Sequence, residues 1–212
     1  VALGNQANPS PKLNLSPSVI GTGYLDFIDT NYPAETSTMQ GTIDPGPFAK
    51  FEIYATDGNN PANTVDATLP YSVVVRAIDA LGNHVTTLNG ILALTFTNFT
   101  GASNSLRGTA PIYATSGNYN FINGTATITG RRLPLAGDSI AGITVDSGAT
   151  TISDPITITS VAGDITEIKI RDAIGDGGND VTDQALTYTT DDSIDFYTSG
   201  YDAEYNFVST LG

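Results

Sequence analysis

The sequence predicts an all-β protein made of tandem β-sandwich modules. Short runs alternate apolar and polar residues, as in FAKFEIYAT at residues 48–56, where Phe51 and Ile53 alternate with Lys50 and Glu52. Turn signals made of Gly, Asn, Asp and Pro separate such runs about every 8–12 residues, which is typical of a β-sandwich. No stretch of more than about ten residues shows a helical period.

A repeated frame marks the centre of each predicted module. The strand-like residues 71–78 lead into a turn at residues 79–83, whose first carboxylate can accept backbone N–H groups and whose Gly82 can take a positive φ. The frame returns 123 residues later, where residues 202–206 match the first turn and Tyr205 replaces the glycine. Two copies, each ending a β-rich run, predict a repeated module.

The predicted organisation has three parts. Residues 1–46 hold two β-like pieces, around 19–28 and 38–43, and end at the strong turn signal Asp-Pro-Gly-Pro. Residues 47–147 are predicted to form a complete β-sandwich. Residues 148–212 restart the pattern as a second β-sandwich, which is incomplete because only six residues follow its turn.

The alternation of apolar and polar residues along the strands predicts the core residues of each module and how the strands of the two modules align. The run TEIKIRD is expected to mirror FAKFEIYAT, with Glu167-Ile168 in the place of Glu52-Ile53. Side chains expected to be buried are Val75, Ala77, Leu92, Leu94, Phe121 and Ile128 in the first module, and Ile168, Ile170, Ile194 and Phe196 in the second.

Composition excludes several classes of function. The net charge of −14 repels nucleic acid and anionic membranes, so we expect no nucleic-acid partner. No run approaches the roughly 18 apolar residues of a membrane span. The chain has no cysteine, which excludes disulfides and thiolate metal sites. Its opening, VALGNQANPSP, lacks a Met and indicates a segment of a longer precursor.

Several motifs resemble those of bacterial immunoglobulin-like repeats, the invasin- and filamin-like modules of surface proteins. The resemblance rests on Pro-Gly-Pro at 45–47, Ala-x-Asp-x-x-Gly-Asn at 77–83, FINGTA at 121–126 and AGDSI at 136–140. It covers residues 45–145 well, 150–212 in part and 1–44 hardly. It implies tandem immunoglobulin-like β-sandwiches in an extracellular or cell-surface protein, where such modules serve as spacers, adhesin tips or fibre subunits.

The loop RDAIGDGGNDVTD predicts a candidate calcium site. Its carboxylates are Asp172, Asp176, Asp180 and Asp183, and Ca²⁺ prefers oxygen ligands of this kind. Their spacing does not match the EF-hand pattern. The alternative is a hydrated loop between strands, because acidic loops are usually solvated.

The remaining candidates are weaker. No catalytic residue is predicted, because the only histidine, His84, has no assignable nucleophile or orienting carboxylate. N-glycosylation sequons begin at Asn14, Asn98 and Asn123. Several tyrosines could form a platform that binds surface glycans, but tyrosine is also an ordinary strand-forming residue. They are Tyr54, Tyr113, Tyr119, Tyr188, Tyr197 and Tyr201.

The sequence therefore favours a non-catalytic extracellular structural protein, a subunit of a surface fibre or stalk. An incomplete second module would expose an apolar face and open strand edges. Residues 1–44 carry β-capable pieces that could complete it by strand addition, within one chain or between copies in a head-to-tail polymer. The alternative is an adhesin or carbohydrate-binding module that binds surface glycans.

Overall fold

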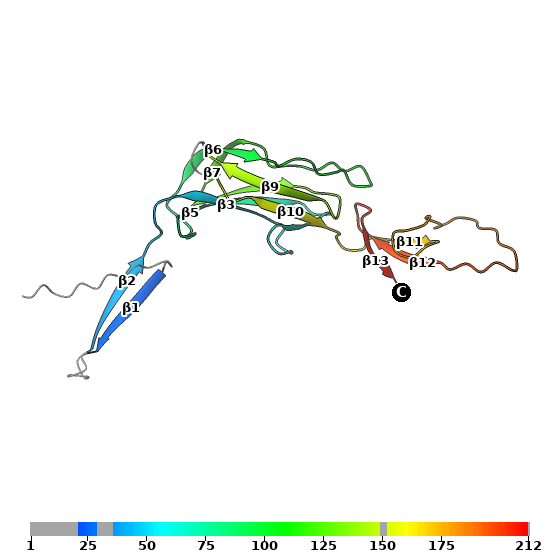
Figure 1. Cartoon of the computed structure of the whole chain (residues 1–212), viewed down its shortest axis with the longest axis horizontal. Helices are drawn as coiled ribbons and strands as arrows, with labels where there is room; N and C mark the ends of the chain where they lie inside the picture. The colour runs from blue at the N-terminus through cyan, green and yellow to red at the C-terminus, as the bar shows by residue number, and fades with distance from the viewer. Residues whose placement is uncertain (1–20, 29–35, 149–151, 212) are drawn as a thin grey trace, which may run out of the picture. The chain divides into compact units, whose positions relative to one another are not determined.

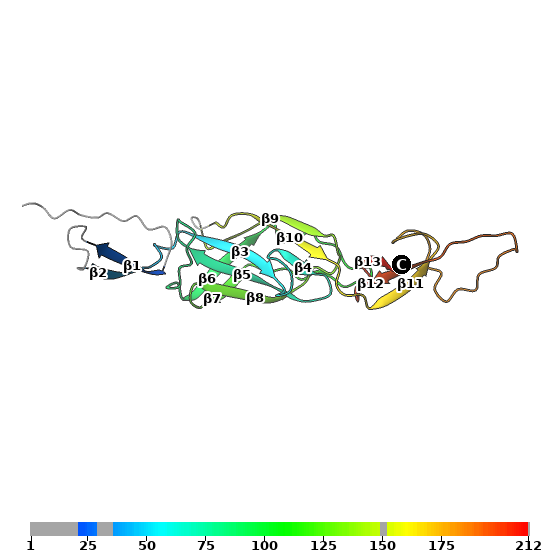
Figure 2. The same ribbon diagram turned by 90° about the horizontal axis from the view of Figure 1, so that it is seen from below.

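A computed structural model describes residues 21–28, 36–148 and 152–211 (Figures 1 and 2). The chain divides into two compact units, residues 1–46 and 47–212. Within the described ranges there are strands, turns and irregular segments but no helix, and so none that could cross a membrane. The prediction of an all-β protein is confirmed.

The first unit contains an antiparallel hairpin. Strands β1 (Gly21–Ile28) and β2 (Thr36–Ile43) pair along their whole length, from Gly21 opposite Ile43 to Ile28 opposite Thr36. Both strands lie where the sequence predicts β-like pieces. No third strand joins this ladder in the part of the chain that the structure describes.

Two sheets with one core between them form a β-sandwich in the second unit. One sheet has the order β3-β5-β8 and the other has the order β4-β10-β9-β6-β7. Neighbours are antiparallel except β4 and β10, which are parallel. The strands are β3 (Lys50–Thr56), β4 (Thr64–Asp66), β5 (Tyr71–Ile78), β6 (Gly90–Thr97), β7 (Gly117–Phe121), β8 (Thr125–Arg131), β9 (Ser139–Asp146) and β10 (Ile156–Val161).

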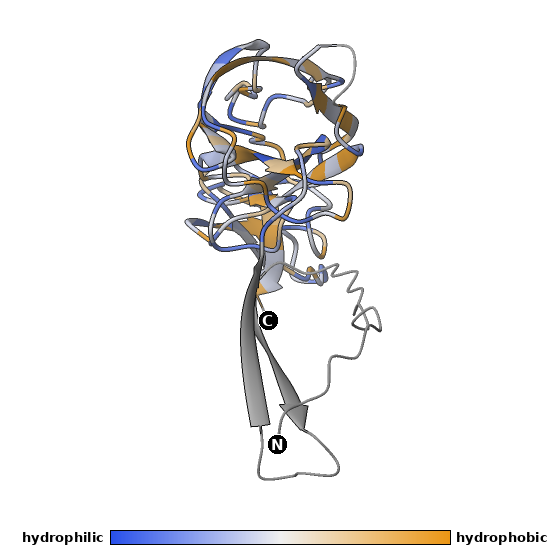
Figure 3. Ribbon diagram, turned by 90° about the vertical axis from the view of Figure 1, so that its left-hand side faces the viewer, coloured by the Kyte–Doolittle hydropathy of each residue, from blue (hydrophilic) through white to orange (hydrophobic). Residues whose placement is uncertain are grey.

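The core between the sheets matches the predicted alternation. Phe51 and Val75 of one sheet and Leu94, Ile143 and Ile158 of the other are among its buried side chains. Hydrophobic segments are visible along the strands in Figure 3. Removing each such side chain from water contributes about 1.5–3 kcal/mol to folding. Of the predicted core, Val75, Ala77, Leu94, Phe121 and Ile128 are buried and Leu92 is partly buried.

A two-residue turn connects β7 to β8 and joins the two sheets. Asn123 and Gly124 both have positive φ, of 49° and 74°, and the flanking Ile122 and Thr125 exchange two backbone hydrogen bonds. Asn-Gly is the preferred pair for a turn that needs left-handed backbone twice. A Cβ atom at residue 124 would lie 2.1 Å from the Val85 carbonyl oxygen, so glycine is also required sterically.

Strand β10 belongs to this sandwich, although it lies beyond residue 147. Ile158 pairs with Ile140 of β9, and Ser160 pairs with Val65 of β4. The Ile158 side chain is fully buried in the core. The turn after β9 contains Gly148, which has a φ of 105°. Glycine-containing turns occur between strands of one module as well as between modules, so this turn does not mark a module boundary.

A third sheet follows and repeats the pairing of the first. It has the order β11-β12-β13, formed by β11 (Glu167–Arg171), β12 (Tyr197–Tyr201) and β13 (Phe207–Leu211). Ile168 lies opposite Gly200, as Phe51 lies opposite Ala77. Because Gly200 and Ala77 hold the same place in the repeated frame, Ile168 matches Phe51. The expected alignment was therefore wrong by two residues, a shift that keeps the same face.

The predicted core of the second module is not buried. Ile168 is 57% exposed and Ile170 is 40% exposed, and Ile194 and Phe196 are exposed as well. Ile168 and Ile170 lie on the face that corresponds to the core face of β3, but burial requires a second layer. No other sheet covers this face among residues 36–148 and 152–211.

We predict that Ile158→Ala lowers the free energy of unfolding by about 2–5 kcal/mol, because it empties a closed core site. The matched control is Ile152→Ala, which truncates an exposed isoleucine and should change stability by less than about 0.5 kcal/mol. Denaturant unfolding measures both. Equal effects of the two substitutions would contradict the assignment of β10 to the sandwich core.

Candidate functional site

The two repeated turns have the same geometry. Asp79 Oδ1 accepts hydrogen bonds of 2.9 Å from the backbone N–H groups of Leu81 and Asn83. Asp202 Oδ1 accepts equivalent bonds, also of 2.9 Å, from Glu204 and Asn206. In each turn the carboxylate satisfies donors that the bend removes from the sheet ladder. The predicted role of the two aspartates is confirmed.

The position of Gly82 needs left-handed backbone in both copies. Gly82 has a φ of 86°, as predicted, and Tyr205 has a φ of 69° at the matching place. A left-handed conformation costs a residue with a Cβ atom roughly 1–2 kcal/mol. The Tyr205 ring is stacked on Tyr201, with centroids 4.6 Å apart, and the Arg107 guanidinium lies 5.4 Å from its centroid. These contacts offset the backbone strain.

The second turn is buried against the sandwich. Asp202 is fully buried, and its Oδ2 accepts a 3.0 Å hydrogen bond from the Gly163 N–H in the linker after β10. Asn206 Oδ1 accepts from the Ala136 N–H at 2.8 Å, while its Nδ2 donates to the Pro134 carbonyl at 3.1 Å. The turn at residues 202–206 therefore joins the third sheet to the sandwich. We call this contact the junction.

Glu204 adds an ionic contact to the junction. Its Oε2 accepts a 2.8 Å hydrogen bond from the Ser105 hydroxyl, and its Oε1 lies 3.5 Å from Arg132 Nη2. Glu204 is only 7% exposed, whereas Leu81, the matching residue of the first turn, is 65% exposed. The two turns share a backbone geometry but present different chemistry at this position.

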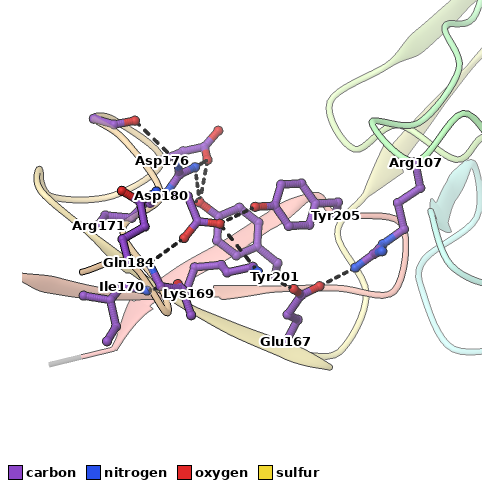
Figure 4. Close-up of polar contacts among 12 residues, drawn as sticks. Arg107, Glu167, Lys169, Ile170, Arg171, Asp176, Asp180, Gln184, Tyr201 and Tyr205 are labelled. Carbon is purple, nitrogen blue, oxygen red and sulfur yellow. Dashed lines mark hydrogen bonds and ion pairs between the residues drawn. The ribbon is translucent and has the colours of Figure 1, made fainter. Parts of the chain in front are cut away.

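A second ionic contact crosses the junction from Arg107 to Glu167 at the start of β11 (Figure 4). Lys169 lies 2.7 Å from the same carboxylate. The hydrogen bond from Lys169 lowers the pKa of Glu167, and Arg107 acts in the same direction. The chain has only eight lysines and arginines, so the concentration of three of them on Glu167 and Glu204 is notable. Sequence reasoning missed the contacts of Arg107 with Glu167 and of Arg132 with Glu204 because these partners lie far apart in the chain.

The polar face of the third sheet is covered by its own loop. Tyr201 donates a 2.7 Å hydrogen bond to Asp176, and Arg171 lies 2.8 Å from the same carboxylate oxygen (Figure 4). The Ser199 hydroxyl donates to the Gly175 carbonyl at 2.6 Å. These contacts hold residues 172–184 against one side of β11 and β12.

The opposite face is apolar and uncovered. It carries Ile168 and Ile170, whose counterparts in the sandwich are the buried Phe51 and Ile53. Ile165 packs where a side chain at Gly200 would lie, since a Cβ atom there would be 2.6 Å from its Cδ1. We call the surface of Ile165, Ile168 and Ile170 the uncovered face. Large exposed apolar patches on proteins mark interaction sites or aggregation liabilities.

The structure does not bring the four candidate calcium ligands together. Asp172 is bound by Asn179 and Asp176 by Arg171, while Asp180 lies beside Lys169 and Asp183 is exposed. No group of three or more potential ligands is positioned for a metal ion in the described ranges. Hydrogen bonds from Asn179 lower the pKa of Asp172, and bonds from Thr182 lower that of Asp180. The calcium site expected from the sequence is not tested by these contacts, which favour the alternative of a hydrated loop.

The sequons differ in their surroundings. Asn14 lies outside the described residues. Asn98 is exposed, and its Nδ2 donates to the Gly142 carbonyl at 3.1 Å. Asn123 is exposed in the turn between β7 and β8. Their use as glycosylation sites stays a prediction.

The tyrosines that could form a glycan platform or serve as ordinary strand residues differ in their surroundings, and glycan binding stays untested. Tyr201 is fully buried, and Tyr113 donates to the Ala102 carbonyl at 3.2 Å; Tyr188 is exposed and packs against Phe196. His84 Nε2 lies 3.2 Å from Thr125 Oγ1. A hollow of about 240 Å³ beside β3 is smaller than typical ligand pockets of about 300–1,000 Å³.

Comparisons with known proteins give little. No protein-family model matches the chain, and no curated protein matches it. Among the solved structures that match are domains 4–9 of the surface layer protein SbsC, with 17% sequence identity and a TM-score of 0.27. The match covers 91% of this chain and 26% of that one. A likeness of this size carries no conclusion about function.

We predict that Glu204→Leu, which installs the residue of the first turn, lowers the free energy of unfolding by about 1–3 kcal/mol, because Ser105 and Arg132 lose their acceptor. The reciprocal control, Leu81→Glu, changes an exposed residue and should alter stability by less than about 0.5 kcal/mol. Denaturant unfolding compares the two. A Glu204→Leu protein as stable as the control would show that the ionic contact contributes nothing.

We predict that the melting temperature is the same with calcium and with a chelator. The reason is that Asp172, Asp176 and Asp180 are already held by separate protein partners, and an ion raises stability only when it binds the folded state. Differential scanning calorimetry measures this. A rise with calcium that Asp176→Asn abolishes would establish the calcium site instead.

Proposed function

We propose that this protein is a non-catalytic extracellular structural protein, a subunit of a surface fibre or stalk that assembles by β-strand complementation. The observation that carries the proposal is the uncovered face of the third sheet, which repeats the pairing of β3 and β5 but has no layer over it among the described residues. An apolar sheet face in water favours association with a complementary layer.

The strand order supports an immunoglobulin-like module. Immunoglobulin domains place strands A, B and E in one sheet and strands C, F and G in the other. If β3, β5, β6, β7, β8, β9 and β10 are taken as A to G, the sandwich has A-B-E in one sheet and G-F-C in the other, with D beside C. Strands β11 and β12 then repeat A and B, and β13 occupies the place of E.

The junction supports a mechanical role. The second turn is fixed by backbone, side-chain and ionic contacts to Gly163, Ala136 and Ser105. Gly163 itself is closely packed, because a Cβ atom there would lie 2.6 Å from Thr68 Oγ1. A linker held in this way transmits force and orientation between modules, as a spacer in a fibre or stalk requires.

The first unit supplies a candidate for the missing layer. The hairpin of β1 and β2 is a two-stranded ladder without a third strand in the described ranges. An isolated hairpin is marginally stable at best in water. Burial of its apolar positions in another module would stabilise both partners. In strand complementation, main-chain hydrogen bonds to an open sheet edge add affinity and alternate side chains fill pockets.

We predict that the full chain forms polymers and that a variant lacking residues 1–46 remains monomeric with an intact sandwich, because the donor of the missing layer is removed. Light scattering after size exclusion and electron microscopy measure assembly, and circular dichroism checks folding. A variant lacking only residues 1–20, which retains both hairpin strands, is the control and should still assemble.

Other outcomes would contradict the proposal. Polymers that persist without residues 1–46 would exclude this segment as the donor. A full chain that stays monomeric at high concentration would exclude self-assembly. Specific binding on a glycan array without self-assembly would favour the adhesin alternative.

A further inference from the structure

We infer that the uncovered face binds the β1–β2 hairpin of a second copy of this chain, which closes over it as a second layer. The inference rests on the proposed function and names the two surfaces that meet. It assigns Ile165, Ile168 and Ile170 as the acceptor and one set of alternate hairpin positions as the donor.

The chemistry of the acceptor follows from its counterpart in the sandwich. Phe51 and Ile53 hold the places of Ile168 and Ile170 and are buried in a core that includes Leu94 and Ile143 of the opposite sheet. Packed sheets lie about 10 Å apart and fill the space with alternate apolar side chains from both layers. The uncovered face therefore requires a β layer whose alternate residues are apolar.

The hairpin provides such a layer. Because partners across an antiparallel ladder share a face, the register divides its residues into two sets. One set has no charge and contains four large apolar residues: Gly21, Gly23, Leu25, Phe27, Ser37, Met39, Gly41 and Ile43. The other is mainly polar: Thr22, Tyr24, Asp26, Ile28, Thr36, Thr38, Gln40 and Thr42.

Self-association of two uncovered faces is the competing arrangement. It would bury both faces but leave each hairpin as an unsupported two-stranded ladder. Docking of the hairpin on the uncovered face would cover the exposed apolar face and support the two-stranded hairpin in one contact.

The length of the linker favours a second copy over the same chain. Only residues 44–49 separate β2 from β3, and an extended chain spans at most about 3.6 Å per residue. The third sheet is attached at the opposite end of β3, where Gly163 packs against Asp66, whose N–H donates to Asp57. Strand β3 itself adds seven residues at about 3.3 Å each. A hairpin could therefore reach the uncovered face of its own chain only by folding back along the whole of β3, whereas a hairpin from a second copy has no such constraint.

The absence of cysteine allows a direct test in the full chain. One chain carries Leu25→Cys and another carries Ile168→Cys, and the two are mixed and mildly oxidised. We expect a disulfide-linked heterodimer as the main product, since facing positions of packed sheets accept inter-sheet disulfides. Asp26→Cys, in the other hairpin set, is the matched control, and the heterodimer should be lost with it.

A second donor variant guards against misfolding. Met39 is the cross-strand partner of Leu25, so Met39→Cys should give the same heterodimer if Leu25→Cys disturbs the hairpin. Electron microscopy of each variant records assembly independently of cross-linking.

The remaining outcomes overturn the inference. Preferential homodimers of the Ile168→Cys chain would show face-to-face association. A chain with both cysteines that cross-links only within itself would show completion inside one molecule. Polymers without either heterodimer would reject this hairpin contact and leave the proposed fibre intact, whereas monomers without cross-links would reject both.

Discussion

A β-sheet with an apolar face has to bury that face against a second layer, and this requirement organises residues 47–212. Sheet β3-β5-β8 meets it within the chain, because β6, β9 and β10 cover Phe51 and Ile53. Sheet β11-β12-β13 has the same strand pairing and an equivalent apolar face, but its loop covers only the polar side. Among the described residues, a second layer covers the apolar face of the first sheet but not that of the second. The second sheet therefore exposes the face that forms the core in the first sheet.

Aspartate carboxylates provide the second constraint, since they hold the turns on which both modules depend. Asp79 and Asp202 each accept two backbone N–H groups of their own turn, and Asp57 and Asp172 hold the loops after β3 and β11 in a similar way. Burial opposes ionisation of Asp57, but hydrogen bonds from Asn60, Asn59 and Asp66 outweigh it and lower its pKa to about 2. Much of the negative charge of the chain is therefore structural. Carboxylates engaged in this way are poor evidence for a metal site, even when several occur in one loop.

Sequence patterns predicted the features that depend on neighbouring residues, namely strands and turns. Alternation gave the strands and their faces, and the frame ending at Asn83 and Asn206 gave the turns and the positive φ of Gly82. The exposure of Ile168 could not be predicted, because burial depends on a second layer that its own strand does not specify. The place of β10 in the sandwich could not be predicted either, because its pairing with β4 sets it. The contacts of Glu204 could not be predicted, because Ser105 and Arg132 come from segments that are distant in the sequence. Pairing across the fold, rather than propensity, decides each of these features.

The difference between Glu204 and Leu81 fixes the order of the two modules along the chain. The second turn fits the end of the sandwich because its carboxylate meets Ser105 and Arg132 there. If the first turn were placed at that surface, Leu81 would leave both polar partners without an acceptor, at a cost of about 1–3 kcal/mol for each buried group. The two modules are therefore not interchangeable, and their order along the chain is fixed. With a hairpin in the first unit and an uncovered face in the third sheet, unlike surfaces would meet at each contact between copies. Such contacts need not close into a ring, so under the proposed assembly a polymer would grow with the same polarity that orders the modules.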